Sequence, residues 1–376
     1  MKERPTICIC GGGNLGTVIA GIASAEGYSV NILTGHPEKW NHEIEVTDTT
    51  GHKFVGHVEC VSSNAKDVIP QSDIILCCLP GSVISPYLID IKPYLSSTAI
   101  VGSVFSNTGF FITAISVLNK NTRLFGFQRV PFIARIIEYG RSATLLSYRK
   151  TLNIAFWGVG SYEQEAYAHE LSEILRTPIR IMDHALQATL TNSNPILHPS
   201  RLYSLFKDFD IHHPCKTIPF FYEDWDNDSS EVLIECDSEF QRMLQKIGLA
   251  SDYTPPLLKY YESTDALSLT RKIKSIVSLK GIKAPMVACD GGYAPDWNNR
   301  YFSEDIPYGM LLIKYVCQMI KMPTPNIDKI ITWYQTQVGR RYLANGVVIV
   351  SEDVKEIACL NQESLQILFQ SMRKLH

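Results

Sequence analysis

A glycine-rich loop follows the first apolar run of the chain and reads Gly11-Gly12-Gly13-Asn14-Leu15-Gly16. The run before it, Ile7 to Cys10, predicts a strand, and Thr17 to Ala25 after it predicts a helix. GxGxxG between a strand and a helix is typical of dinucleotide binding, since its glycines allow a tight turn, close approach to a pyrophosphate and close helix packing. A turn without a ligand is the alternative, and the flanking elements argue against it. The loop residues expected to bind a cofactor are Gly11, Gly13, Asn14, Leu15 and Gly16.

The fold class follows from how strand and helix signals continue after this loop. Up to about Met182, short β-branched runs alternate with helical segments, which predicts a parallel sheet covered by helices. The predicted strands are Thr6–Cys10, Ser29–Leu33, Ile74–Leu79, Thr98–Val101, Arg123–Phe127, Leu152–Trp157 and Ile179–Met182. Beyond His184 apolar residues recur at helical spacing, as in Glu231–Ile247 and Asn326–Val338. We therefore expect an α/β protein with an N-terminal Rossmann domain, a doubly wound parallel sheet, at residues 1–182 and a C-terminal all-α domain at 183–376.

Composition excludes several classes of protein. The chain has 376 residues, enough for two domains, and its 45% apolar and 19% charged content excludes disorder, collagen and coiled coil. Thirty-five basic against 38 acidic residues, without a basic run, make nucleic acid an unexpected partner. The longest later apolar stretches, Ile74 to Leu79 and Met310 to Ile320, are too short to span a membrane.

Cysteine usage and the first residues bear on location. Ten cysteines are scattered without a CxxC pair, and most lie in apolar runs, which favours a reducing compartment. The first apolar run reaches the glycine loop too early to be a signal peptide. We expect a cytoplasmic protein. The oligomeric state stays open, with a homodimer as one option.

The end of the second strand bears on cofactor choice. An acidic residue there would bind the ribose 2′-hydroxyl of NAD, but the position holds Thr34. His36 and Lys39 could neutralise the 2′-phosphate of NADP, so NADP is favoured, while Glu38 keeps NAD open. Both basic residues could equally be solvated loop residues. Further along, Leu79 and Pro80 end a strand at the carboxyl edge of the sheet and are expected to contact the cofactor.

One histidine stands out in the second half. It lies in Asn194-Pro195-Ile196-Leu197-His198-Pro199, where prolines four residues apart predict that Asn194 to Pro199 is not regular helix. His198 is therefore placed at a helix junction. A lone histidine is more often structural than catalytic, and the irregular backbone is what raises His198 above the others.

A second unusual string precedes an apolar helix and reads Arg300-Tyr301-Phe302-Ser303-Glu304-Asp305-Ile306-Pro307-Tyr308-Gly309. A purely structural interpretation is available, in which Ser303 or Asp305 caps the helix and Arg300 pairs with a carboxylate. A catalytic interpretation is that a carboxylate on one nitrogen of His198 fixes its tautomer, while an arginine orients a carboxylate substrate. The residues alone leave both open.

With these motifs together, the sequence resembles the opine dehydrogenase family, of the octopine and nopaline type. The likeness rests on the glycine loop, the His198 segment and the Arg300 string, and it extends to Phe220-Phe221-Tyr222 and the helix from Cys236 to Gly248. It implies NAD(P)H-dependent reductive condensation of an amino acid with a 2-keto acid such as pyruvate. It further implies that His198 and Asp305 form a catalytic dyad and that Arg300 binds a substrate carboxylate.

The sequence departs from the family pattern at one position, and two other functions stay open. Arg129, in a segment similar to one that lines the family's substrate pocket, is bulkier and more basic than expected, so the resemblance does not name the amino acid. A ketopantoate reductase-like 2-keto or hydroxy acid dehydrogenase is the nearest rival, but Ala188 and Leu190 stand where its lysine would precede an asparagine. A non-catalytic nucleotide sensor is a third interpretation. No metal is expected.

Overall fold

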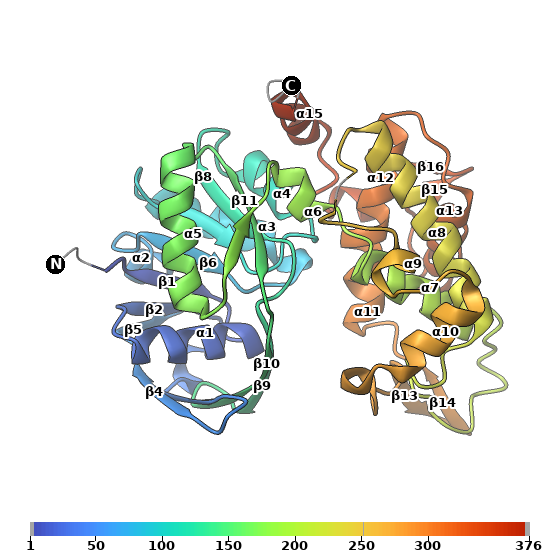
Figure 1. Ribbon diagram of the computed structural model, residues 1–376, viewed down its shortest axis with the longest axis horizontal. Coiled ribbons are helices and arrows are strands. Elements are labelled where there is room, and N and C mark those ends of the chain that lie inside the picture. Colours follow the sequence, from blue (N-terminus) through green and yellow to red (C-terminus); the bar gives the residue numbers. More distant parts are fainter. Residues whose placement is uncertain (1–3, 251, 373–376) are drawn as a thin grey trace. The chain divides into compact units, whose positions relative to one another are not determined.

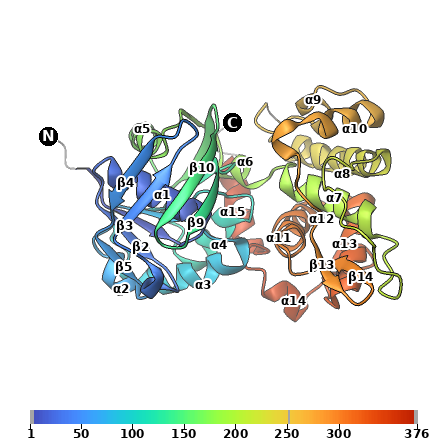
Figure 2. The ribbon, with the colours of Figure 1, turned by 90° about the horizontal axis from the view of Figure 1, so that it is seen from below.

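The computed structural model describes residues 4–250 and 252–372 (Figures 1 and 2). The chain forms two compact units. The first runs to Thr189 and also takes in the segment from Asn361 onward, and the second is Leu190–Leu360. The predicted division into domains at residue 182 stays a prediction.

The first unit is built on a sheet whose eight described strands lie in the order β12-β11-β8-β7-β6-β1-β2-β5. These strands are β1 (Ile7–Cys10), β2 (Val30–Leu33), β5 (Cys60–Ser62), β6 (Ile74–Cys77), β7 (Ile100–Ser103), β8 (Arg123–Phe127), β11 (Leu152–Trp157) and β12 (Ile179–Ile181). The predicted strands are all present. Most neighbours are parallel, but β11 pairs with β8 in antiparallel fashion, so the sheet is mixed at that end.

Helices cover both faces of this sheet. They are α1 (Asn14–Ala25), α2 (Ala65–Val68), α3 (Gly81–Ile91), α4 (Phe110–Val117), α5 (Ser161–Leu175), α6 (Ala185–Thr189) and α15 (Gln362–Met372). Figures 1 and 2 show α1 and α5 on one face and α3 and α4 on the other, and α15 packs on α4. Burial on both faces explains why β1, β2, β6 and β7 are buried at every residue.

A second sheet, absent from the sequence-based prediction, lies against α1. Its order is β4-β3-β10-β9, from β3 (Glu43–Thr47), β4 (Lys53–His57), β9 (Phe132–Glu138) and β10 (Ser142–Tyr148). The approach is close, because a Cβ on Gly21 of α1 would lie 2.6 Å from a methyl of Val46. Helix α1 is thus held between two sheets, which fixes the loop that precedes it.

The second unit is mainly helical, as predicted. Its helices are α7 (Asn194–Phe206), α8 (Asn227–Lys246), α9 (Leu257–Tyr260), α10 (Ala266–Ser275), α11 (Arg300–Ser303), α12 (Leu311–Met319), α13 (Pro325–Val338) and α14 (Glu352–Lys355). Two hairpins that the sequence did not suggest join them: β13 (Met286–Cys289) with β14 (Gly292–Pro295), and β15 (Leu343–Ala344) with β16 (Val347–Val348). Between α11 and α12 the backbone forms a π-helical segment, Asp305–Met310.

The prediction that Asn194 to Pro199 is not regular helix was wrong, because both prolines lie in the first turns of α7. Pro195 occupies one of the first helical positions, where an amide has no partner inside the helix. Pro199 then removes only the bond to the Pro195 carbonyl. His198 is therefore a helical residue, and the regular backbone of α7 fixes the direction of its side chain.

Candidate active site

The glycine loop has the geometry that a dinucleotide requires. Gly11 has a φ of +107°, a conformation that side chains disfavour. A Cβ on Gly16 would lie 2.0 Å from the carbonyl oxygen of Gly11, so only glycine lets α1 start this close to β1. A Cβ on Gly13 would meet no atom within 4 Å among the described residues, which leaves space beside the backbone. No described side chain caps α1, so its first amides are available to a phosphate.

The other predicted cofactor residues surround this loop in different ways. Leu79 packs on it, because a Cβ on Gly11 would lie 2.8 Å from the Leu79 side chain. Pro80 is the residue before α3. The side-chain oxygen of Asn14 accepts a hydrogen bond from the Ile136 amide (2.8 Å), so this side chain holds β9, while Leu15 packs against the core. Asn14 and Leu15 can therefore offer a ligand their backbone amides.

The tip of β2 carries no carboxylate. Thr34 is buried, and its hydroxyl lies 3.3 Å from the hydroxyl of Tyr139. His36 is exposed, and its Nδ1 lies 3.5 Å from a carboxylate oxygen of Glu38. The residue closest to the end of the strand is thus neutral, and two basic residues, His36 and Lys39, and one acid, Glu38, follow it.

In the second unit the structure brings His198 and Asp305 together. Nδ1 of His198 lies 2.7 Å from Oδ2 of Asp305, and both side chains are largely buried. His198 comes from α7, and Asp305 is the first residue of the π-helical segment, which packs on α7. A carboxylate accepts hydrogen bonds, so it holds the hydrogen of the imidazole on Nδ1 and stabilises the charged ring. This leaves Nε2 as the basic nitrogen.

Aromatic residues enclose the rest of this imidazole. Tyr301 stacks on its face, with ring centres 4.1 Å apart, and Phe221 meets it edge-on at 5.7 Å. The hydroxyl of Tyr222 lies 2.9 Å from Nε2. In the sequence, Phe221 and Tyr222 had been noted only as part of the family resemblance, together with Phe220, which is 39% exposed. No local pattern placed Tyr222 beside His198, because 24 residues separate them.

The structure does not match the purely structural interpretation of the Arg300 string. No described side chain caps the apolar helix α12, Asn299 caps α11, and Asp305 is engaged with His198. Among the described residues Arg300 makes no ion pair or side-chain hydrogen bond. It lines a pocket of about 410 Å³ with Lys283, Ala284, Pro285, Met286, Asn299 and Tyr301. Tyr301 therefore contacts His198 and also borders the pocket of Arg300.

A buried arginine holds the segment that carries Tyr222. Arg201, one turn after His198 on α7, donates hydrogen bonds to the carbonyls of Phe221 and Asp224 and to the carboxylate of Asp226. Burial lowers the pKa of Arg201, and Asp226 opposes this shift. Because Arg201 and His198 share a helix, the aromatic residues have a fixed place relative to the imidazole.

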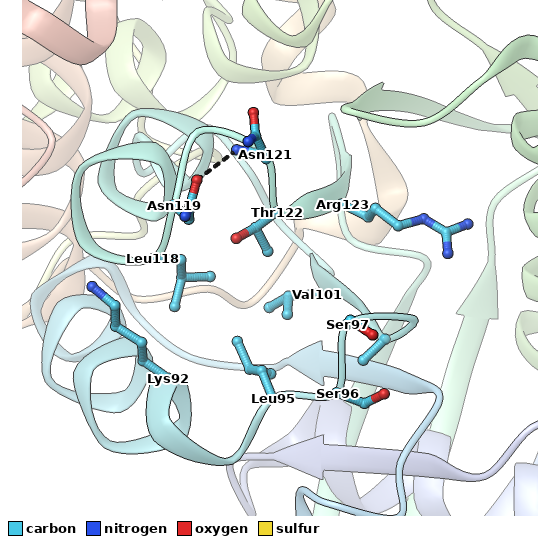
Figure 3. Close-up of a pocket in the computed structure, with 11 residues that line it drawn as sticks. Lys92, Leu95, Ser96, Ser97, Val101, Leu118, Asn119, Asn121, Thr122 and Arg123 are labelled. Carbon is cyan, nitrogen blue, oxygen red and sulfur yellow. Dashed lines mark hydrogen bonds between the residues drawn. The ribbon is translucent and has the colours of Figure 1, made fainter.

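A second pocket of similar volume lies in the first unit, at the amino ends of β7 and β8 (Figure 3). Its cations are already engaged: Lys92 donates to the carbonyl of Val117, and Arg123 donates to Thr98 and pairs with Glu163. Figure 3 shows the Arg123 guanidinium extending away from Val101 and Thr122. In a doubly wound sheet ligands bind at the opposite, carboxyl edge, where the glycine loop lies.

Residues 4–250 and 252–372 contain no group of three or more side chains suited to a metal ion. None of their helices has the length and apolar character that a membrane span needs.

Several known proteins resemble this chain in sequence and in fold. The family model for the α-helical domain of NAD/NADP octopine/nopaline dehydrogenase matches residues 181–338. Octopine dehydrogenase from Mizuhopecten yessoensis is 28% identical, with 94% of each chain covered. Tauropine dehydrogenase from Arabella iricolor is also 28% identical, over 90% of this chain and 93% of its own. A solved structure of octopine dehydrogenase with NADH and L-arginine has a TM-score of 0.87 and 25% identity, and covers 98% of each chain.

Together with the glycine loop, these likenesses define an NAD(P)-dependent oxidoreductase that acts on CH–NH bonds, and its cofactor is a nicotinamide dinucleotide. More narrowly, the chain is similar to octopine dehydrogenases over nearly its whole length, and its residues 181–338 match the α-helical domain of the octopine/nopaline dehydrogenase family.

Proposed function

We propose that the protein joins an amino acid to a 2-keto acid such as pyruvate by NAD(P)H-dependent reduction of their imine, and catalyses the reverse reaction. The observation that carries this proposal is the 2.7 Å contact between His198 and Asp305 beside a pocket that contains Arg300, which has no ion pair among the described residues. Condensation of an amine with a ketone needs a group that removes a proton from the ammonium and later returns one to the departing hydroxyl. An imidazole is suited to both steps near neutral pH.

Each part of the site then has a role. Gly11, Gly13, Gly16 and the first amides of α1 would hold the cofactor, which would supply the hydride for reduction of the imine carbon. His198 accepts the ammonium proton and becomes an imidazolium, which Asp305 stabilises through Nδ1. The same proton then leaves with the hydroxyl as water. Removing either residue would slow proton transfer without changing the glycine loop.

Two cations in the pocket match two substrate carboxylates. Arg300 can bind one in bidentate fashion, and Lys283 provides a second positive charge. The carboxylates of Glu223 and Asp224 form no ion pair with Lys283. That of Glu223 accepts a hydrogen bond from the Gly281 amide, and that of Asp224 accepts one from the Phe220 amide. We therefore propose that Arg300 orients one carboxylate and Lys283 attracts the other.

We propose NADPH as the preferred cofactor. Thr34 at the tip of β2 carries no charge that would repel a 2′-phosphate, and His36 and Lys39 are exposed nearby. Steady-state kinetics with both cofactors tests this preference. A higher kcat/KM with NADH would contradict it and would indicate that the carboxylate of Glu38 binds the ribose 2′-hydroxyl of NADH.

We also propose a cytoplasmic location, because all ten cysteines are free thiols. Measured thiol accessibility in native and unfolded protein would show whether they remain reduced after purification from the natural host.

The reaction is tested by mixing the purified protein with NADPH, pyruvate and a pool of amino acids while following the absorbance of the reduced nicotinamide. We expect oxidation only when both substrates are present. Oxidation with the keto acid alone would instead indicate the ketopantoate reductase-like alternative. No oxidation with any pair of substrates and either cofactor would overturn the proposed function.

A further inference from the structure

The basic nitrogen of His198 is not open to a substrate in this structure. Asp305 occupies Nδ1, and the hydroxyl of Tyr222 lies 2.9 Å from Nε2. Because Nδ1 carries the hydrogen, Nε2 has a lone pair, and the phenol donates its proton to it. Tyr301 covers one face of the ring, and His198 is 5% exposed. A proton therefore reaches Nε2 either through the oxygen of Tyr222 or after Tyr222 has moved.

Several contacts hold Tyr222 in place. Its ring stacks on Trp225 with planes 5° apart, and Trp225 donates its amide to the carbonyl of Tyr222. Arg201 binds the carbonyls on either side of this turn, at Phe221 and Asp224. Tyr222 is 4% exposed. Movement of the side chain would break this packing, so a route through the hydroxyl is the less costly one.

We propose that Tyr222 is a proton relay between His198 and the substrate amine, an inference that rests on the proposed function. The phenol oxygen accepts a proton from the substrate ammonium while the phenol hydrogen moves to Nε2. The amine becomes neutral and nucleophilic, the imidazole becomes imidazolium, and Tyr222 is a neutral phenol before and after. The amine nitrogen then bonds to the keto carbon, and a second proton from this nitrogen passes to the former carbonyl oxygen, which gives the carbinolamine. In the second step Nε2 returns its proton to the phenol oxygen, the phenol hydrogen moves to the carbinolamine hydroxyl, the C–O bond breaks and water leaves.

Two properties of Tyr222 suit this role. Burial raises its pKa above the ordinary value, and the neighbouring phenol of Tyr301 adds to the shift. A phenol with a raised pKa stays protonated at neutral pH, so it passes protons on without becoming a charged intermediate. Tyr301 also lines the pocket of Arg300, which places the relay next to the proposed carboxylate site.

The test is Tyr222→Phe, which keeps the ring that packs on Trp225 and removes only the hydroxyl. We expect kcat to fall by about 10², at the lower end of the range for positioned proton transfer, with the KM for pyruvate nearly unchanged. Tyr334→Phe is the matched control, since Tyr334 is equally buried in the same unit and stacks on Phe302 without contacting His198. Its kcat should stay near that of the wild type.

A double variant separates a relay from a structural role. If Tyr222 and His198 act in one proton path, Tyr222→Phe combined with His198→Ala should be little slower than His198→Ala alone. If Tyr222 only packs, Tyr222→Phe leaves Nε2 open and kcat stays within about 3-fold of wild type, far from the loss expected for positioned proton transfer, which overturns the relay. An inactive wild type overturns the proposed function and the relay together. An active wild type with a fully active Tyr222→Phe overturns the relay alone.

Discussion

His198 and Asp305 lie 107 positions apart in the sequence and 2.7 Å apart in the structure. The contact requires both α7, which carries the histidine, and the π-helical segment that begins with the aspartate. π-helical turns are rare and occur often at functional sites. Here the unusual backbone presents a carboxylate to an imidazole, so substitutions at either residue should act on the same step.

Asp305→Asn should lower kcat by about 10² to 10⁴, because the amide no longer fixes the tautomer or stabilises the imidazolium. Combining it with His198→Ala should cost little more than either change alone. Two-substrate kinetics beside thermal melts checks both statements. A fully active Asp305→Asn enzyme with a lowered melting temperature would show that the contact is only structural.

His198→Ala should lower kcat over the same range of about 10² to 10⁴ while leaving NADPH affinity nearly unchanged. The reason is that the glycine loop belongs to the first unit and the imidazole to the second. Fluorescence titration with NADPH measures the affinity independently of turnover. A parallel loss of NADPH affinity and kcat would show that His198 also contributes to cofactor binding.

Gly13→Val should abolish cofactor binding without unfolding the protein. The new Cβ meets no described protein atom within 4 Å, so it fills only the space that a pyrophosphate needs. Gly160→Val is the matched control, because Gly160 also precedes a helix in extended conformation, next to α5. Binding titrations on both variants should show loss for Gly13→Val alone. Unchanged NADPH affinity in a folded Gly13→Val variant would show that this loop does not bind the cofactor.

Arg300→Lys should raise the KM for one carboxylate substrate more than it lowers kcat, because the charge remains while the bidentate geometry is lost. Lys283→Met should raise the KM for the other substrate. Lys280→Met, a change at an exposed lysine outside the pocket, serves as the control. Equal KM values for both substrates in Lys283→Met and wild type would remove Lys283 from the site.

The first unit should lose stability in mild acid through His184. Burial lowers the pKa of this histidine from 6.5 to about 4, and its Nε2 contacts Ser371 of α15 at 2.8 Å. Below pH 6.5 His184 is protonated in the unfolded chain but stays neutral in the folded chain until about pH 4. The free energy of unfolding is therefore unaffected by His184 above pH 6.5 and falls as the pH drops from 6.5 towards 4.

Melting temperatures of His184→Gln across this interval should therefore depend less steeply on pH than those of the wild type. His169→Gln, at an exposed histidine of α5, should keep the wild-type slope. A slope for His184→Gln equal to that of wild type would assign the acid sensitivity to other groups.

Features of this structure could be predicted from the sequence where the interacting residues are close together in the chain. The glycine loop acts within a few residues, and its strand, turn and helix were all recognisable. The sheet of β3, β4, β9 and β10 was missed although β4 alternates exposed and buried residues, because such short strands give a weak signal. Proline rules misjudged α7, since they did not allow for the free amides at a helix start. The Tyr222–His198 contact joins distant segments and had no local signature.

The return of the chain at Asn361 to the first unit makes the second unit an insertion within the first. Helix α15 packs on α4 of the first unit but is synthesised after the whole of the second unit. The unit that contains the glycine loop therefore lacks one of its described helices until the second unit has been made. Deletion of residues 361–372 would consequently destabilise the first unit, although Leu360, the residue beside the cut, belongs to the second.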